Sequence, residues 1–177
     1  MKKLTLVFIT ALILFGGYKL VTAPKIIAPG VVFPSLGQQH VLPSSPEIMY
    51  NSNPPTSGPH HSTAAQSGIY DTEFPDRELI HNIEHGHIWI SYRPDLPKDE
   101  IEQLAVIAKS YGTKIIMAPR AKDDSPIVVA AWQHLLKLNT VDEAQIKAFI
   151  NALQGHGPED VPDSGFKDFR GQNKPQQ

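Results

Sequence analysis

Apolar and polar side chains alternate along residues 86–92, which predicts a β-strand because successive side chains of a strand point to opposite faces. One face of this strand would carry His87, Trp89 and Ser91, while the other would carry two isoleucines and a tyrosine. Pro94 ends the run, since proline lacks the N–H group that a strand needs for pairing. The other predicted elements follow this strand in order.

Apolar residues then recur at helical spacing in two segments, 99–111 and 141–153, and each segment predicts a helix with one buried face. Thr140 is the predicted N-cap of the second helix, with Glu143 at the capping-box position three residues later. Glycines follow both segments and are typical of helix ends. Two short apolar runs between the helices predict two more strands, at residues 114–118 and 127–132.

The order of these elements predicts an α+β domain. The first two strands are joined through a helix and should run parallel, whereas the third follows a short charged turn and should run antiparallel. We expect a small mixed β-sheet with two helices packed on one face, preceded by a long ordered loop. The predicted parts are an extended proline-rich linker at 24–46, the domain at 47–160 and a disordered tail at 161–177. Residues 31–33 are a candidate edge strand.

Composition excludes several classes of site. The 177-residue chain contains no cysteine, so disulfides, thiolate zinc sites and iron–sulfur centres are ruled out. The formal net charge is −2, and the lysines and arginines form no basic stripe. We therefore predict no binding to nucleic acid.

The N-terminal residues 1–23 combine two early lysines with a long apolar run, which is typical of an export signal. We interpret residues 4–21 as an uncleaved anchor that is long enough to cross a bilayer. The alternative is a signal peptide cleaved after Ala23, although Pro24 at the next position argues against cleavage. The early lysines place the N-terminus in the cytoplasm. The predicted location is the cell membrane, with a single N-terminal pass and the domain on the extracytoplasmic side.

Histidines are concentrated where the first predicted strand of the domain begins. Three of the eight, His81, His85 and His87, lie within seven residues, and His60 and His61 lie in the long loop upstream. If the segment before the strand is helical, His81 and His85 share one face at i,i+4 spacing. If it is extended, His85 and His87 share one face instead. The remaining histidines, at 40, 134 and 156, stand alone and are predicted to have no role.

Either geometry brings two imidazoles within reach of one ion, and the loop can supply a third. We predict a transition-metal site with His60, His81 and His85 as ligands, and with His87 and Met117 as candidate extra ligands. Imidazole donors without thiolate suit copper(II) or zinc, whereas a methionine sulfur would leave copper(I) open. The alternative is that the histidines only brace the loop against the sheet by hydrogen bonds, and that the domain binds a protein partner.

Residues 81–85 also match H-x-x-E-H, the inverted signature of zinc peptidases, in which Glu84 would be the general base. That chemistry needs a helix carrying both histidines, and the strand predicted directly after Gly86 shortens any such helix. We therefore assign no catalytic residue, and Glu84 would be one only in a zinc hydrolase.

Several motifs between residues 47 and 160 together resemble a family of bacterial envelope proteins, the domain of unknown function 3105. The most specific are NPPTSGPH at 53–60 and IHNIEHG at 80–86. The matching positions are Pro54, Pro55, Ser57, Gly58, His60, His81, Glu84, His85 and Gly86. The resemblance implies a membrane-anchored extracytoplasmic domain but supplies no activity.

Overall fold

The structure is a computed structural model that describes residues 27–159 and 161–172. The predicted membrane anchor at 4–21 lies outside these residues, and no helix within them is long and apolar enough to cross a bilayer. The elements in chain order are β1 (Val31–Val32), β2 (Gly68–Ile69), α1 (Asp76–Glu84), β3 (Ile88–Tyr92), α2 (Lys98–Tyr111), β4 (Ile115–Pro119), β5 (Ile127–Ala131), β6 (His134–Leu138), α3 (Glu143–Leu153) and β7 (Lys167–Asp168).

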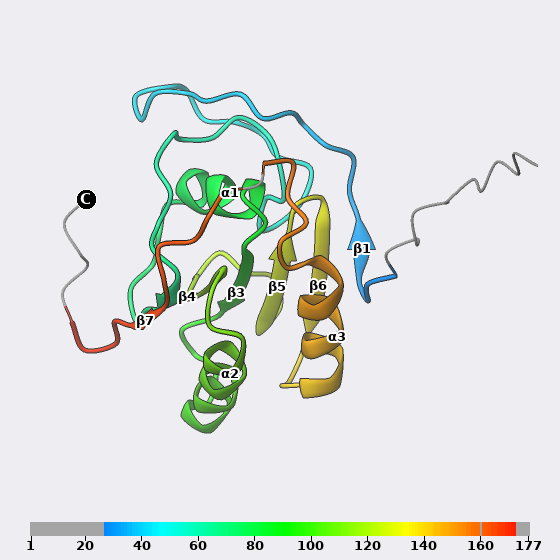
Figure 1. Ribbon diagram of the computed structural model, residues 1–177, viewed down its shortest axis with the longest axis vertical. Helices are drawn as coiled ribbons and strands as arrows, with labels where there is room; N and C mark the ends of the chain where they lie inside the picture. Colours follow the sequence, from blue (N-terminus) through cyan, green and yellow to red (C-terminus); the bar gives the residue numbers. More distant parts are fainter. Residues whose placement is uncertain (1–26, 160, 173–177) are drawn as a thin grey trace, which may run out of the picture.

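Within the described residues the strands form one mixed seven-stranded sheet in the order β1-β6-β5-β3-β4-β2-β7 (Figure 1). The central strand β3 runs parallel to β4 and antiparallel to β5, which confirms the predicted α+β fold with a mixed sheet. β5 pairs with β3 and not with β4, because the connection at 120–126 crosses the end of β3. There the Arg120 N–H donates to Tyr92 O at 2.8 Å, and the Arg93 N–H donates to Pro126 O at 2.9 Å.

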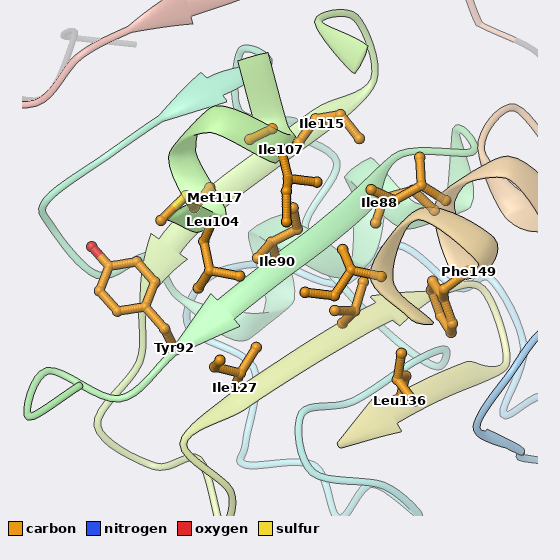
Figure 2. Close-up of a cluster of buried hydrophobic side chains, with 14 of the residues drawn as sticks. Ile88, Ile90, Tyr92, Leu104, Ile107, Ile115, Met117, Ile127, Leu136 and Phe149 are labelled. Carbon is orange, nitrogen blue, oxygen red and sulfur yellow. The ribbon is translucent and has the colours of Figure 1, made fainter. Parts of the chain in front are cut away.

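Helices α2 and α3 cover one face of the sheet, as predicted (Figure 1). Their apolar stripes pack on the alternate residues of β3, β4 and β5 that point to this face (Figure 2). Phe149 and Leu104 are fully buried here, beside Ile88 and Ile90 of β3. Each such side chain contributes roughly 1.5–3 kcal/mol through removal of apolar surface from water.

The other face of the sheet is covered by α1 and the long loop before it. The sequence left residues 79–85 open between helix and strand, and the structure makes them helical up to Glu84. Pro75 precedes the helix, and Asp76 and Glu78 lie in its first turn, where negative charge favours a helix. Three apolar residues of α1 join Trp89 in a second core: Leu79, Ile80 and Ile83.

Two segments predicted as an extended linker and a disordered tail pack against the domain instead, and the candidate edge strand at 31–33 is confirmed as β1. Residues 27–46 follow the domain surface, with β1 paired to β6 and a bridge between His40 and His60. Residues 161–172, predicted as disordered, contain β7, which pairs with β2. Phe169 is buried and stacks on Tyr70 with ring centroids 4.7 Å apart. Backbone pairing holds the first segment and the buried Phe169 ring holds the second, and neither kind of contact gives a periodic pattern in the sequence.

Two details of the predicted elements differ in the structure. Strand β6 was not predicted, and it follows β5 after a turn of only two residues, Trp132 and Gln133. Helix α3 is capped by Asp142 and not by Thr140, since the Asp142 carboxylate accepts the Gln145 N–H at 3.0 Å. An aspartate is an equally good cap, and the position closer to the first apolar residue of the helix is the one used.

Candidate metal centre

Four side chains from three segments converge beside the C-terminal half of α1. His81 and Glu84 stand three residues apart on the helix, His60 comes from the long loop, and His40 comes from the segment after β1. Each offers a nitrogen or oxygen atom that can bind a metal, and these atoms all lie within 4.8 Å of one another. This set differs from the predicted one, because His40 takes the place that the sequence analysis gave to His85.

One oxygen of Glu84 lies at the centre of the group. Its Oε2 atom is 2.9 Å from His60 Nε2, 3.8 Å from His40 Nε2 and 3.8 Å from His81 Nδ1. Two atoms that bind the same zinc ion lie ~3.0–3.4 Å apart, given metal–ligand bonds of about 2.1 Å. The distances from Glu84 Oε2 to the three histidine nitrogens are therefore within about 1 Å of the separation expected for ligands of one ion.

Backbone pairing sets the two loop histidines side by side. The His60 N–H donates to Gln39 O at 2.9 Å, and the Val41 N–H donates to His60 O at 2.7 Å. Gly58 supplies the turn before His60 with φ of 115°, a conformation that glycine adopts without strain. The rings of His40 and His60 are consequently edge to face, with centroids 5.0 Å apart.

Asn82 holds the second half of the loop on α1. Its side-chain amide donates to Ala65 O and its carbonyl accepts the Ala65 N–H, both at 2.8 Å. Asn82 is fully buried, so these two bonds satisfy groups that water cannot reach. Its role is structural, and it does not contact the histidine rings through any of these bonds.

The hydrogen bonds of His60 determine which ring nitrogen carries a hydrogen and which can offer a lone pair to a metal. Nδ1 lies 2.8 Å from Gly58 O, and a carbonyl oxygen only accepts, so Nδ1 carries a hydrogen. Nε2 then faces Glu84 Oε2 at 2.9 Å, and either a proton or a cation must lie between these two atoms. Histidines that bind metals commonly donate their other N–H to a carbonyl in this way.

Two buried polar atoms of the group have no hydrogen-bond partner within the described part of the chain: His81 Nδ1 and Glu84 Oε1. Burial lowers the pKa of His81 to about 4, helped by repulsion from His85, His60 and His40 and opposed by a hydrogen bond with the His61 backbone. His81 is therefore neutral at pH 7 and can offer a lone pair. Orphaned buried atoms are uncommon in proteins, and a bound ion would satisfy both.

Most of the chain matches one protein family. A family model described as "Protein of unknown function (DUF3105)" matches residues 41–165, well over half of the chain. The chain belongs to this family. Neither the curated proteins nor the solved structures contain a significant match. Three of the four clustered residues lie inside the matched DUF3105 region, and His40 lies one position before it.

His85 of the DUF3105 domain does not join the first group, although it lies close to it. It is the C-cap residue of α1, its ring centroid is 4.3 Å from that of His81, and its Nε2 faces Glu159 at 3.3 Å. Among the described residues, neither group of candidate ligands contains both His81 and His85. An H-x-x-E-H peptidase site needs both on one ion, so the structure gives that chemistry no support.

His87 and Met117 are not placed as metal ligands. His87 is buried beside Asp163, with 3.7 Å between Nε2 and Oδ1, and burial lowers its pKa to about 4 despite that carboxylate. Met117 points to the opposite face of the sheet, among the apolar residues around Leu104 (Figure 2). The alternation of side chains along β4 explains this, because Met117 shares a face with Ile115.

Two candidate ligands were not predicted from the sequence: His40 of the first group, and Glu159, which groups with Glu84 and His85. Both lie in segments rich in proline and glycine, where no periodic pattern links them to α1. Only the pairing of the His40 segment with the loop, and of the Glu159 segment with the end of α1, brings them near.

Proposed function

We propose that this domain binds one divalent transition-metal ion, zinc or copper(II), through His40, His60, His81 and Glu84. The observation that carries the proposal is the convergence of three imidazoles on one buried carboxylate, with all four ligand atoms within 4.8 Å. Glu84 is fully buried, and a buried carboxylate is stable only when it is paired, protonated or bound to a metal.

The donor set argues for the class of metal. Three nitrogens and one oxygen suit zinc and copper(II), whereas magnesium and calcium prefer oxygen ligands alone. Copper(I) prefers sulfur donors, but the chain has no cysteine, and Met117, the methionine considered as a ligand, lies on the opposite face of the sheet. Zinc and copper(II) are therefore the two metals to be tested.

The protonation states also favour a cation. His81 is neutral above about pH 5, since its pKa is about 4, so protons compete little with a metal at neutral pH. His60 donates its Nδ1 hydrogen to the Gly58 carbonyl and offers Nε2 toward Glu84.

We further propose that residues 4–21 anchor the protein in the membrane and hold the domain outside the cytoplasm. The support for this proposal is the apolar run that follows two lysines.

The test is a calorimetric titration of the full-length protein in detergent, stripped of metal with a chelator and then titrated with zinc or copper(II). We expect about one ion per chain at this centre, and a loss of at least about 100-fold in affinity for His60→Ala and His81→Ala. His134→Ala is the matched control, because the His134 ring bonds only to Trp132 O at 2.8 Å and is outside the candidate groups. Equal affinity in all four proteins would refute the proposal.

A second candidate function is favoured by the same 2.9 Å contact between His60 and Glu84. A proton between them would make a buried brace that ties the loop to α1 without any metal, and the domain would then act as an interaction module. This alternative predicts one melting temperature with and without chelator. The metal hypothesis predicts a higher melting temperature when zinc is present, because a ligand that binds only the folded state stabilises it.

A further inference from the structure

Glu84 also belongs to a second group of candidate ligands. Together with His85 and Glu159 it offers three ligand atoms that lie within 4.8 Å of one another. His85 Nε2 and Glu159 Oε2 are 3.3 Å apart, which is the separation expected for two ligands of one ion. Glu84 is thus the residue that both groups share.

The second group is assembled by close contact between two glycine-containing segments. Gly155 N–H donates to Gly86 O at 2.8 Å, and the Glu159 N–H donates to Glu84 O at 3.1 Å. A Cβ atom on Gly157 would lie 2.1 Å from Glu84 O, so only glycine allows this approach. These contacts hold the segment after α3 against the end of α1 and set Glu159 beside His85.

The two oxygens of the Glu84 carboxylate have different surroundings. Oε2 faces His40, His60 and His81, while Oε1 is buried and has no hydrogen-bond partner among residues 27–159 and 161–172. A carboxylate with two free lone-pair systems commonly bridges two ions, which in two-metal sites lie ~3.5–4 Å apart. The rings of His81 and His85, one from each group, are 4.3 Å apart between centroids, which is compatible with such neighbouring ions.

We propose that the domain holds two transition-metal ions bridged by Glu84, with His85 and Glu159 as the other ligands of the second ion. This inference rests on the proposed function and extends it. The first ion would be bound by four residues, three of them buried and His40 exposed, whereas the second would have three protein ligands. The side chains of His85 and Glu159 are 12% and 47% exposed, so the second ion faces solvent. Its fourth position is open to water or to an exchangeable anion.

The charges are compatible with two ions. His85 is neutral when it binds a metal, and Glu84 and Glu159 together supply two negative charges against the four positive charges of two divalent ions. The single negative charge of Glu84 is half the positive charge of one divalent ion. The two negative charges of Glu84 and Glu159 are likewise half the positive charge of two divalent ions. The second carboxylate therefore offsets part of the repulsion that a second cation would meet.

The first experiment counts metal ions in the full-length protein in detergent, after stripping and reloading with zinc and removal of unbound metal. We expect two ions per chain in the wild type and one in His85→Ala and Glu159→Gln. His156→Ala is the control in the same segment, since His156 is outside both groups, and it should keep two. One ion in the wild type, unchanged by Glu159→Gln, would overturn the two-metal inference and leave the proposed function standing. No bound ion at all would overturn both.

The second experiment uses copper(II), whose unpaired electron reports on a neighbouring ion. At two equivalents the wild-type protein should show the broadened or diminished paramagnetic resonance signal of two interacting copper ions. Glu159→Gln, loaded to its own capacity, should show the signal of isolated copper. Glu159 is largely exposed, so this variant is expected to fold like the wild type. An isolated-copper signal in the wild type at two equivalents would refute a bridged pair.

Discussion

Replacing Glu84 by glutamine separates the metal hypothesis from the brace hypothesis, because it keeps the shape of the side chain and removes its charge. In the metal-free variant the glutamine amide can donate to His60 Nε2, which lies 2.9 Å from Glu84 Oε2 in the wild type. A charge-assisted hydrogen bond worth ~1.5–3 kcal/mol would become a neutral one worth ~0.5–1.5 kcal/mol. The expected loss of unfolding free energy without metal is therefore only about 1 kcal/mol.

The effect with metal should be larger. At a free zinc concentration 100 times the wild-type Kd, bound metal stabilises the wild type by about 2.7 kcal/mol. Loss of a direct ligand lowers affinity by at least ~100-fold, so at the same zinc concentration the variant gains only about 0.4 kcal/mol. For a domain of this size, 1 kcal/mol shifts the melting temperature by ~2–4 °C. Zinc should then raise the melting temperature by ~5–10 °C in the wild type and by ~1 °C in the variant.

The assay is thermal unfolding followed by circular dichroism, with the full-length protein in detergent, with zinc and with chelator. His134→Ala again serves as the control and should respond to zinc like the wild type. Equal zinc-induced shifts in the wild type and Glu84→Gln would refute the assignment of Glu84 as a ligand. A loss of more than about 3 kcal/mol in the metal-free variant would show that the brace accounts for the burial of Glu84.

Three further predictions concern pH, the glycine contact and a buried ion pair. Burial lowers the pKa of His87 from 6.5 to about 4, so the unfolded chain binds a proton below pH 6.5 that the folded chain takes up only near pH 4. Stability should fall as pH decreases through this window, and His87→Asn should flatten the fall by ~1–3 kcal/mol in urea titrations at pH 4.5 and 7.5. Gly157→Ala should cost ~1–3 kcal/mol in the same assay, because its Cβ would meet Glu84 O, and an unchanged urea midpoint would contradict that contact. Arg120→Met should destabilise by ~3–5 kcal/mol by leaving Asp123 buried without its 2.6 Å partner, and Asp123→Asn in the same background should restore part of the loss if the uncompensated charge is the cause.

Much of the fold follows from local patterns. The alternation in β3 and the helical stripes of α2 and α3 were readable because each element buries one face, and burial imposes a period of two or of 3.6 residues. The class, α+β with a mixed sheet, follows from the order of those elements. The short strands β2 and β7 have two residues each, too few to show any period, and they exist only through pairing with neighbours.

The candidate site was predictable in part. His60 and His81 were predicted as ligands because histidines are dense around a short segment, and the structure brings them together with Glu84, which the sequence had suggested only as the base of a zinc hydrolase. His85 was predicted to share the ion with them, but it faces Glu159, and His87 faces Asp163. A rotation of 100° per helical residue separates His85 from Glu84, so neighbours in sequence can serve different groups.

The sequence by itself determined which chemistry is available, namely imidazole and carboxylate donors without thiolate, and it shows an apolar N-terminal run before the domain. Only the tertiary structure decided which donors meet. His40 reaches the group through backbone pairing with His60, and Glu159 reaches it through glycine contacts at the end of α1. Both contacts join residues distant along the chain, and such contacts depend on how whole segments pack, which no local pattern of residues encodes.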